Sequence, residues 1–246
     1  MDTSPRRSGL LYNDPMVPAP GLVPLLAAHR DRFRPVIPFN LTAGGLVVFD
    51  FTEASPDFAH IDINDVAGFT ERLFARISQA DLPVGVGRYN EDRMIYRHSP
   101  LFDGEAERRS IHLGIDLFVV EGTEVMSPWP AKVHSVADNT GLGNYGPTVI
   151  LEHEIENTSF WTLYGHLGRH SVVRLEMGQP LDAGEEFASV GDVSENGNWP
   201  PHLHFQVMAD LGGHSGDFPG VAAPSERDRW LEICPDPNLI LRIPDL

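Results

Sequence analysis

The sequence predicts a mainly β protein: an antiparallel β-sheet core with an N-terminal α/β extension. From about residue 105 onward, short apolar runs alternate with Gly, Asn and Asp, which is the pattern of repeated antiparallel strands. Before them, one strand-like run is followed by one run with helical periodicity. A Pro-rich segment of about 38 residues precedes both.

Composition places the chain among soluble globular proteins. Its 246 residues, 41% of them hydrophobic, suffice for one large domain with a buried core. The formal net charge of −17 predicts a surface that repels nucleic acid and anionic membranes, so neither is expected as a partner. The single cysteine, Cys234, excludes an intrachain disulfide. No secretion signal and no membrane-spanning run is recognisable, so we expect a cytoplasmic protein.

Residues 1–104 are predicted to form the N-terminal extension. Its Pro-rich first part should be extended. Residues 46–51 are typical of a buried strand, and residues 64–80 of an amphipathic helix capped by Asn64 or Asp65. The apolar positions at helical spacing are Val66, Phe69, Leu73, Phe74 and Ile77.

The segment RYNEDRMIYRH, residues 88–98, mixes charged residues with Tyr89 and Tyr96. Such a segment could line a substrate groove. Its charges favour a solvated linker instead, and that is the interpretation we adopt from the sequence.

Residues 105–215 are predicted to form the β domain and residues 216–246 a C-terminal segment. The predicted strands cover residues 111–119, 131–137, 147–154, 159–167, 185–192 and 202–208. A loop over 212–224 should lead to a short helix over 226–233. We expect Ser225 and Asp228 to form its capping box and Pro235 to end it.

Five polar residues suggest a site. His202 and His204 share one face of a strand, because side chains alternate along it. His112 and Asp116, four residues apart, also share a face, and Gly114 with its Ile neighbours favours a strand there. A catalytic zinc ion takes three protein ligands and keeps one position for water. His112, Asp116 and one histidine of the pair would supply that set.

His166 follows a predicted strand on which Thr162 and Tyr164 should share its face. Beside a metal, His166 and the other histidine of the 202/204 pair could position or deprotonate the bound water. His153 is interpreted as a hydrogen-bonding support.

The motifs HLGID, YGHL and PHLHF, in this order, resemble those of the lysostaphin-type (LytM-like) zinc metallopeptidases. The resemblance covers roughly residues 105–210. It implies a lysostaphin-like core (a duplicated hybrid motif) and one zinc ion bound by His112, Asp116 and His204. It also implies catalysis by His166 and His202 on a peptide substrate, either peptidoglycan-type or another Gly/D-Ala-containing peptide. The version of the domain is similar to those associated with kinase-like and aminotransferase-like proteins.

Two other functions compete with hydrolysis. The first is a catalytically inactive, metal-binding regulatory module that has a metabolic enzyme as its partner. Two features favour it: the expected cytoplasmic location, and the ENGNWPP segment, residues 195–201, which stands where many lysostaphin-type peptidases have a shorter turn. Trp199 in that segment could narrow the groove. An iron oxygenase also uses two histidines and one carboxylate, but the HxxxD spacing and the two additional histidines favour hydrolysis. The scissile bond and the oligomeric state are not determined by the sequence.

Overall fold

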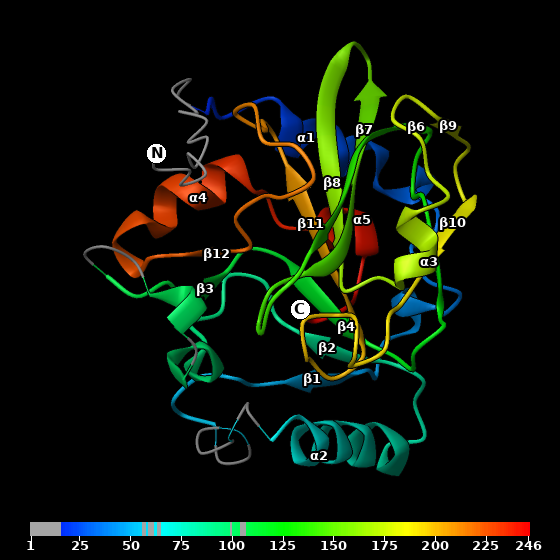
Figure 1. Ribbon diagram of the computed structural model, residues 1–246. Helices are drawn as coiled ribbons and strands as arrows, with labels where there is room; N and C mark the ends of the chain where they lie inside the picture. The colour runs from blue at the N-terminus through cyan, green and yellow to red at the C-terminus, as the bar shows by residue number, and fades with distance from the viewer. Residues whose placement is uncertain (1–15, 56–57, 59–61, 63–64, 99, 104–106) are drawn as a thin grey trace, which may run out of the picture.

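The computed structural model describes residues 16–246 except 56–57, 59–61, 63–64, 99 and 104–106. In these residues the main sheet has eight strands in the order β1-β2-β4-β11-β8-β7-β6-β9 (Figure 1). Two small sheets pair β10 with β5 and β12 with β3. The strands are β1 (Val47–Phe49), β2 (Gly85–Gly87), β3 (Ile111–His112), β4 (Ile115–Phe118), β5 (Glu124–Met126), β6 (Ala131–Asn139), β7 (Gly146–Ile155), β8 (Thr158–Gly165), β9 (Pro180–Leu181), β10 (Glu186–Ser189), β11 (His202–Met208) and β12 (Val221–Ala222).

The helices lie around this sheet, and short 3-10 turns connect several elements. The α-helices are α1 (Leu22–His29), α2 (Val66–Gln79), α3 (Arg169–Val172), α4 (Arg227–Ile233) and α5 (Asn238–Leu241). The 3-10 turns are η1 (Arg30–Arg32), η2 (Leu41–Ala43), η3 (Met94–His98), η4 (Pro100–Phe102) and η5 (Pro224–Glu226). Strands therefore dominate the architecture, and the predicted mainly β class is confirmed.

The main sheet is mixed rather than purely antiparallel. In the order in which the strands lie in the sheet, every neighbouring pair from β2 to β9 is antiparallel, as expected. Only β1 and β2, at one edge of this sheet, pair parallel. Both of these edge strands come from the N-terminal extension. The extension is thus joined to the core by the backbone hydrogen bonds between β2 and β4.

The two faces of the sheet carry different apolar clusters. Leu117 and Phe205 belong to the largest cluster, into which α1 and α5 also pack, behind the sheet in Figure 1. On the opposite face, one cluster gathers side chains of the N-terminal extension around Phe118. Another gathers the C-terminal segment around Met208 and Cys234. The candidate site lies on this second face, where both terminal segments meet the sheet.

Helix α2 forms as its periodicity predicts. The Asp65 side chain accepts a hydrogen bond from the Gly68 amide at 3.0 Å and caps the helix. Its buried residues, Phe69, Leu73 and Ile77, pack in the same apolar cluster as Phe49 of β1. Asn64, the other predicted cap, lies outside the described residues.

Two local predictions are wrong. Residues 22–29, expected to be extended, form α1, since Leu22 and Leu26 bury one side and Pro24 falls in the first turn, where its missing N–H costs no helical bond. The predicted capping box of α4 is absent as well. Ser225 lies inside η5, and Glu226 occupies the N-cap of α4 without a side-chain hydrogen bond.

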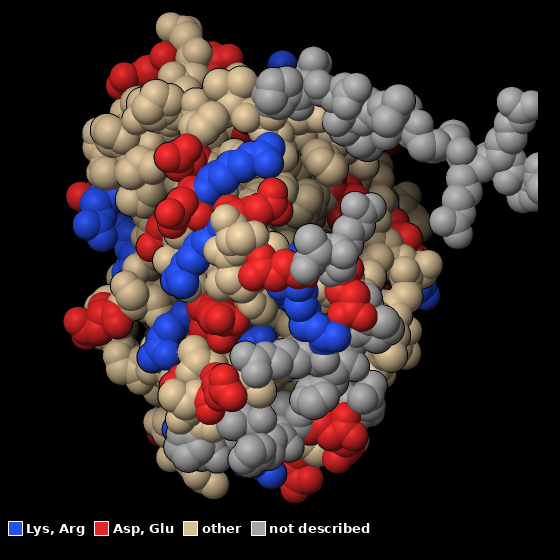
Figure 2. All heavy atoms as spheres, turned by 90° about the vertical axis from the view of Figure 1, so that its left-hand side faces the viewer, with Lys and Arg blue, Asp and Glu red and all other residues tan. Residues whose placement is uncertain are grey.

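Charged side chains of both signs are interspersed on the face that lies at the left of Figure 1 (Figure 2). Opposite charges therefore offset one another locally on this face, although the chain carries a large net negative charge. Among the described helices, none combines the length and apolar character needed to cross a lipid bilayer.

Candidate metal centre

The pairing of β11 with β4 builds the centre of the site. Their register places His204 directly opposite Asp116, and His202 opposite Phe118. Side-chain alternation sends His202 and His204 to one face, while Leu203 of the same strand enters the large core cluster. The same-face arrangement predicted for the two histidines is what the strand provides.

His112, at the end of β3, completes a cluster of three. The distances are 3.0 Å from His112 Nε2 to His204 Nδ1, 3.0 Å from His204 Nδ1 to Asp116 Oδ1, and 3.3 Å from His112 Nε2 to that oxygen. Ligand atoms bound at about 2.0–2.1 Å to a tetrahedral zinc ion stand roughly 3.3 Å apart. The three atoms thus already have the spacing and the N, N, O chemistry of a zinc site.

Hydrogen bonds on the far side of each imidazole hold it in the protonation form that a metal ligand needs. His112 Nδ1 lies 2.9 Å from the carbonyl oxygen of Arg88, which can only accept, so Nδ1 carries the proton and Nε2 is left with its lone pair. His204 Nε2 lies 3.0 Å from Gln206 Oε1. Because the Gln206 amide nitrogen donates to the carbonyl of Pro219 at 3.1 Å, its oxygen faces His204. His204 Nδ1 therefore presents its lone pair to the cluster.

Gly114 makes room for the His204 ring. A Cβ at this position would lie 2.5 Å from Cε1 and 2.7 Å from Nε2 of His204, and 2.8 Å from the Phe205 carbonyl oxygen. Gly114 lies between β3 and β4, and the absence of a side chain there leaves room for the His204 ring and the Phe205 backbone of β11. The glycine in HLGID thus has a steric reason.

His166 and His202 stand beside the cluster as a pair. Their ring centroids are 4.2 Å apart, and His202 Nε2 lies 3.8 Å from Asp116 Oδ1. His166 Nδ1 donates to the carbonyl of Asn196 at 2.7 Å, and His202 Nδ1 to that of Pro200 at 2.6 Å. Both imidazoles consequently keep an unprotonated Nε2 that can accept a proton.

The predicted shared face of His166, Thr162 and Tyr164 is wrong for His166. Strand β8 ends at Gly165, and His166 adopts a left-handed backbone with φ of 62°. Tyr164 points into the large core cluster, whereas the turn sends His166 to the opposite side, next to His202. The alternation rule fails here because the strand has already ended.

Burial and charge define the electrostatics of the cluster. Burial alone would raise the pKa of Asp116, but the neighbouring His112 and Arg93 outweigh it and hold that pKa well below its usual value. Burial, with Arg93 as the second cause, lowers the pKa of His112 to about 4. Burial also lowers the pKa of His202 and, together with His202, that of His166. Neutral imidazoles beside an ionised carboxylate are the forms that a divalent cation binds.

Arg93 contradicts the expectation of a solvated linker over residues 88–98. Only 1% of its surface is exposed, and its Nη1 lies 2.5 Å from Asp116 Oδ2 and 2.9 Å from the hydroxyl of Tyr96. Its Nε donates to Glu91 at 3.0 Å. Glu91 and Arg93 are therefore buried and paired, whereas Arg88 and Asp92 of the same segment are exposed as predicted.

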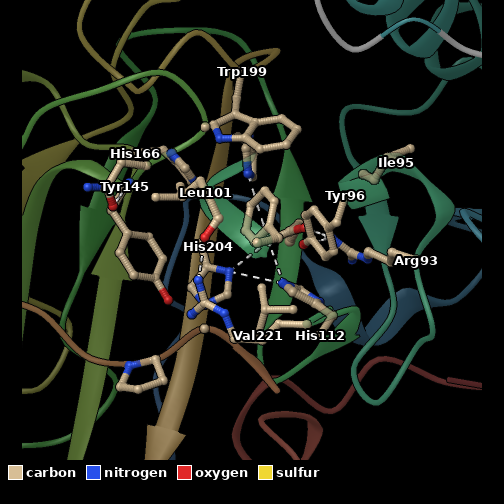
Figure 3. A pocket seen from close by; sticks show the side chains of 18 of the residues that line it. Arg93, Ile95, Tyr96, Leu101, His112, Tyr145, His166, Trp199, His204 and Val221 are labelled. Atoms are coloured by element: carbon tan, nitrogen blue, oxygen red, sulfur yellow. Dashed lines mark hydrogen bonds and ion pairs between the residues drawn. The ribbon is translucent and has the colours of Figure 1, made fainter. Parts of the chain in front are cut away.

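The cluster opens into a pocket of about 260 Å³. Trp199, Tyr96, Val221 and Tyr145 surround the His112–His204 pair in Figure 3. Trp199 is 8% exposed and lies in the pocket wall, which is the position from which it could narrow the groove. All five polar residues of the site are almost completely buried: His112, Asp116, His166, His202 and His204.

The five residues predicted from the sequence lie close together in the structure, but the residues that support them were not predicted. Gln206 could have been found, because it shares the face of His204 two residues further along β11. Arg93 gave no signal beyond its charge. His153, interpreted as a hydrogen-bonding support, lies on β7 with Nε2 at 2.7 Å from Thr162 Oγ1, apart from the three-residue cluster.

Comparison with known proteins agrees with the geometry. The sequence model of the family described as "Peptidase family M23" matches residues 110–216. An "Uncharacterized metalloprotease" of Haemophilus influenzae is 34% identical over 96 residues, which are 39% of this chain and 18% of that protein. The chain therefore spans less than a fifth of this curated relative. The matched family segment contains all five site residues but not Arg93.

Solved structures of peptidases are also similar to part of the chain. A zinc-containing peptidase from Vibrio cholerae is 28% identical, with a TM-score of 0.34, over 46% of this chain and 30% of that one. The catalytic domain of the antimicrobial peptidase lysostaphin from Staphylococcus simulans is 24% identical, with a TM-score of 0.33, over 47% of this chain and 77% of that one. The family match and the metalloprotease relative together support a metallopeptidase.

Proposed function

We propose that this protein is a zinc-dependent metalloendopeptidase that hydrolyses a peptide or amide bond. The observation that carries the proposal is the preformed cluster of His112 Nε2, Asp116 Oδ1 and His204 Nδ1, each held in its ligand form by a second hydrogen bond. Two further neutral histidines stand beside it. A purely structural metal site has no need of such a pair.

The residues divide into two roles. His112, Asp116 and His204 would hold one zinc ion, which when bound supplies Lewis-acid polarisation of the scissile carbonyl and a water of lowered pKa. His202 and His166 expose Nε2 with Nδ1 protonated, so each can take a proton from a water molecule or donate one, once protonated, to the leaving amine. The apolar walls keep bulk water away from these groups and strengthen their interactions.

Metal analysis tests the proposal first. We expect elemental mass spectrometry to find about one zinc per wild-type chain, purified without added zinc, and none in the His112→Ala/His204→Ala double variant. The same measurement distinguishes zinc from iron. Bound zinc would argue against an iron oxygenase, and bound iron would argue for one. A folded wild type that stays metal-free after zinc is supplied would overturn the proposal.

Peptide hydrolysis by the zinc-loaded protein tests the activity itself. The resemblance to lysostaphin-type peptidases makes Gly- and D-Ala-containing peptides suitable first substrates. Cleavage at a defined bond, abolished by a chelator and restored by zinc, is expected. Zinc binding without cleavage of any peptide would contradict the proposed peptidase activity and favour a metal-binding regulatory module instead.

A metal-binding regulatory module is the second candidate, and the burial of the cluster favours it. The three proposed ligand residues are at most 3% exposed, which suits a metal that is held rather than used. A pull-down that recovers one enzyme partner in stoichiometric amount, from a zinc-loaded protein without peptidase activity, would support this function.

A further inference from the structure

Four apolar side chains form the wall of the pocket immediately beside the cluster: Tyr96, Phe118, Trp199 and Val221. The Phe118 ring stacks on His202, with 5.0 Å between the centroids and 29° between the planes. The Trp199 ring packs edge-on against His166, with 6.4 Å between the ring centroids. Val221 pairs with His112 across the two strands β12 and β3. The apolar wall is therefore continuous with the groups that would carry out hydrolysis.

Behind this wall, the N-terminal extension supplies further apolar lining. Ile95, Leu101 and Phe102 from η3 and η4, and Phe69 from α2, all face the pocket. Phe102 packs on Tyr96 with 4.4 Å between ring centroids. These residues lie outside the segment that matches the peptidase family, so this part of the pocket belongs to the extension of this chain.

Arg93, the charged residue of the pocket lining that lies against the cluster, is committed to other partners. Apart from Asp116 of the three-residue cluster, the charged residues in the pocket lining include Arg93, Arg109 and Asp217. Arg93 is bonded to Asp116 and Glu91, and Arg109 donates to the carbonyl of Leu101. Asp217 is exposed to solvent at the pocket edge. An ionised substrate side chain would consequently enter an apolar wall at a desolvation cost.

We infer that the pocket takes a bulky apolar side chain, such as Leu or Phe, adjacent to the scissile amide. The inference rests on the proposed hydrolase function and names its substrate class. A cavity of about 150 Å³ is enough to bind benzene, so the 260 Å³ found here accommodates a phenyl or isobutyl group. A glycine at the same position leaves these walls in contact with water and gains none of the apolar burial.

A peptide panel measures the preference directly. The zinc-loaded full chain is given blocked tetrapeptides that differ only in one central residue: Gly, Ala, Leu, Phe, Asp or Lys. We expect kcat/KM for Leu or Phe to exceed that for Gly by at least roughly 10-fold, because one methylene in a hydrophobic pocket is already worth about 10- to 200-fold. Equal or faster cleavage of the Gly peptide overturns the inference and leaves the hydrolase function intact.

A binding measurement separates the pocket from the activity. Acetohydroxamate and 3-phenylpropionohydroxamate carry the same metal-binding group, but only the second carries a phenyl ring. Calorimetry on the zinc-loaded protein should show the phenyl probe binding at least about 10-fold more tightly. Equal affinities of the two probes would overturn the inference whether or not any peptide is cleaved.

Two matched variants locate the phenyl site. Ile95→Ala should reduce the affinity ratio of the two probes several-fold, because Ile95 lines the pocket. Ile77→Ala is the control, since Ile77 is equally buried in the same apolar cluster but does not line the pocket. A preference for the phenyl probe without peptidase activity would refute the proposed function and retain the pocket assignment. An unchanged ratio in Ile95→Ala would refute the assignment of the wall.

Discussion

The guanidinium of Arg93 and the carboxylate of Asp116 form a buried ion pair in which Nη1 donates to Oδ2 across 2.5 Å. The other oxygen of the same carboxylate, Oδ1, faces His112 and His204. The two oxygens of Asp116 thus have separate partners, and Arg93 orients the carboxylate so that Oδ1 faces the two histidines of the cluster. A residue of the N-terminal extension in this way supports Asp116, one of the three proposed metal ligands.

Replacement of Arg93 by Lys should weaken zinc binding by about 10- to 100-fold, the usual effect of losing a support of a metal ligand. Lysine keeps the positive charge but lacks the planar guanidinium that donates hydrogen bonds to Asp116, Tyr96 and Glu91 at the same time. The Asp116 carboxylate should therefore be held less firmly. Chelator competition measures the affinity, and the absorption spectrum of the Co²⁺-substituted protein reports the ligand geometry.

Arg88→Lys is the matched control for this change. The Arg88 side chain is half-exposed and reaches Glu91 at 3.8 Å, while only its backbone carbonyl contacts His112. It should bind zinc like the wild type. A wild-type affinity and Co²⁺ spectrum in Arg93→Lys would show that the ion pair does not orient Asp116.

Gly114→Ala should displace the His204 ring, because the added Cβ would lie 2.5 Å from its Cε1. We expect a loss of about 1–3 kcal/mol in the free energy of unfolding, as for other overpacked sites, together with weaker zinc binding. Urea unfolding and chelator competition measure the two effects. Gly21→Ala is the control, since a Cβ there meets no atom within 4 Å. Indistinguishable behaviour of the two variants would contradict the steric role of Gly114.

His166→Ala and His202→Ala should each reduce peptide turnover by roughly 100- to 10,000-fold, as expected for loss of a general acid or base. Both should retain about one zinc ion, because neither side chain belongs to the three-ligand cluster. Turnover and metal content are measured on the same samples. His170→Ala, which removes an exposed histidine bonded to Ser189, serves as the control. Zinc lost from either of the first two variants would require a new division into ligands and catalysts.

His153 should make stability depend on pH. Burial lowers its pKa to about 4 in the folded protein, against about 6.5 when exposed. Between these values the unfolded chain binds the proton and the folded chain does not, so the free energy of unfolding falls as the pH decreases from 6.5 to 4. The full contribution is on the order of 3 kcal/mol for a difference of this size.

His153→Gln removes that titration and should flatten the pH dependence over this window. Urea unfolding of the wild type and the variant at several pH values between 4.5 and 7.5 measures the difference, in which the other buried histidines cancel. The variant should be less stable at pH 7, because it loses the stacking on Phe160. Parallel stability curves for the two proteins would exclude His153 as a source of the dependence.

Local periodicity predicted several elements and the shared face of His202 and His204, whereas the set of five candidate site residues also depended on the family motifs. The strand over 202–208 was predicted with the bounds of β11, because its alternating side chains specify one buried and one functional face. Asp65 was recognisable as a helix cap from residue type and position alone. Helix α1 was missed because Pro content outweighed the i, i+4 spacing of Leu22 and Leu26.

The amino-acid sequence by itself therefore placed His202 and His204 on one face of a strand, and the family motifs singled out His112, Asp116 and His204 as a candidate ligand set. Only the tertiary structure decided which residues support and enclose that cluster. Arg93 reaches Asp116 because the segment between β2 and β3 folds over the sheet, and Cys234 contacts Gln206 because the C-terminal segment packs on the same face. Such contacts join positions far apart in the chain, and a buried, paired arginine has the same sequence signature as a solvated one.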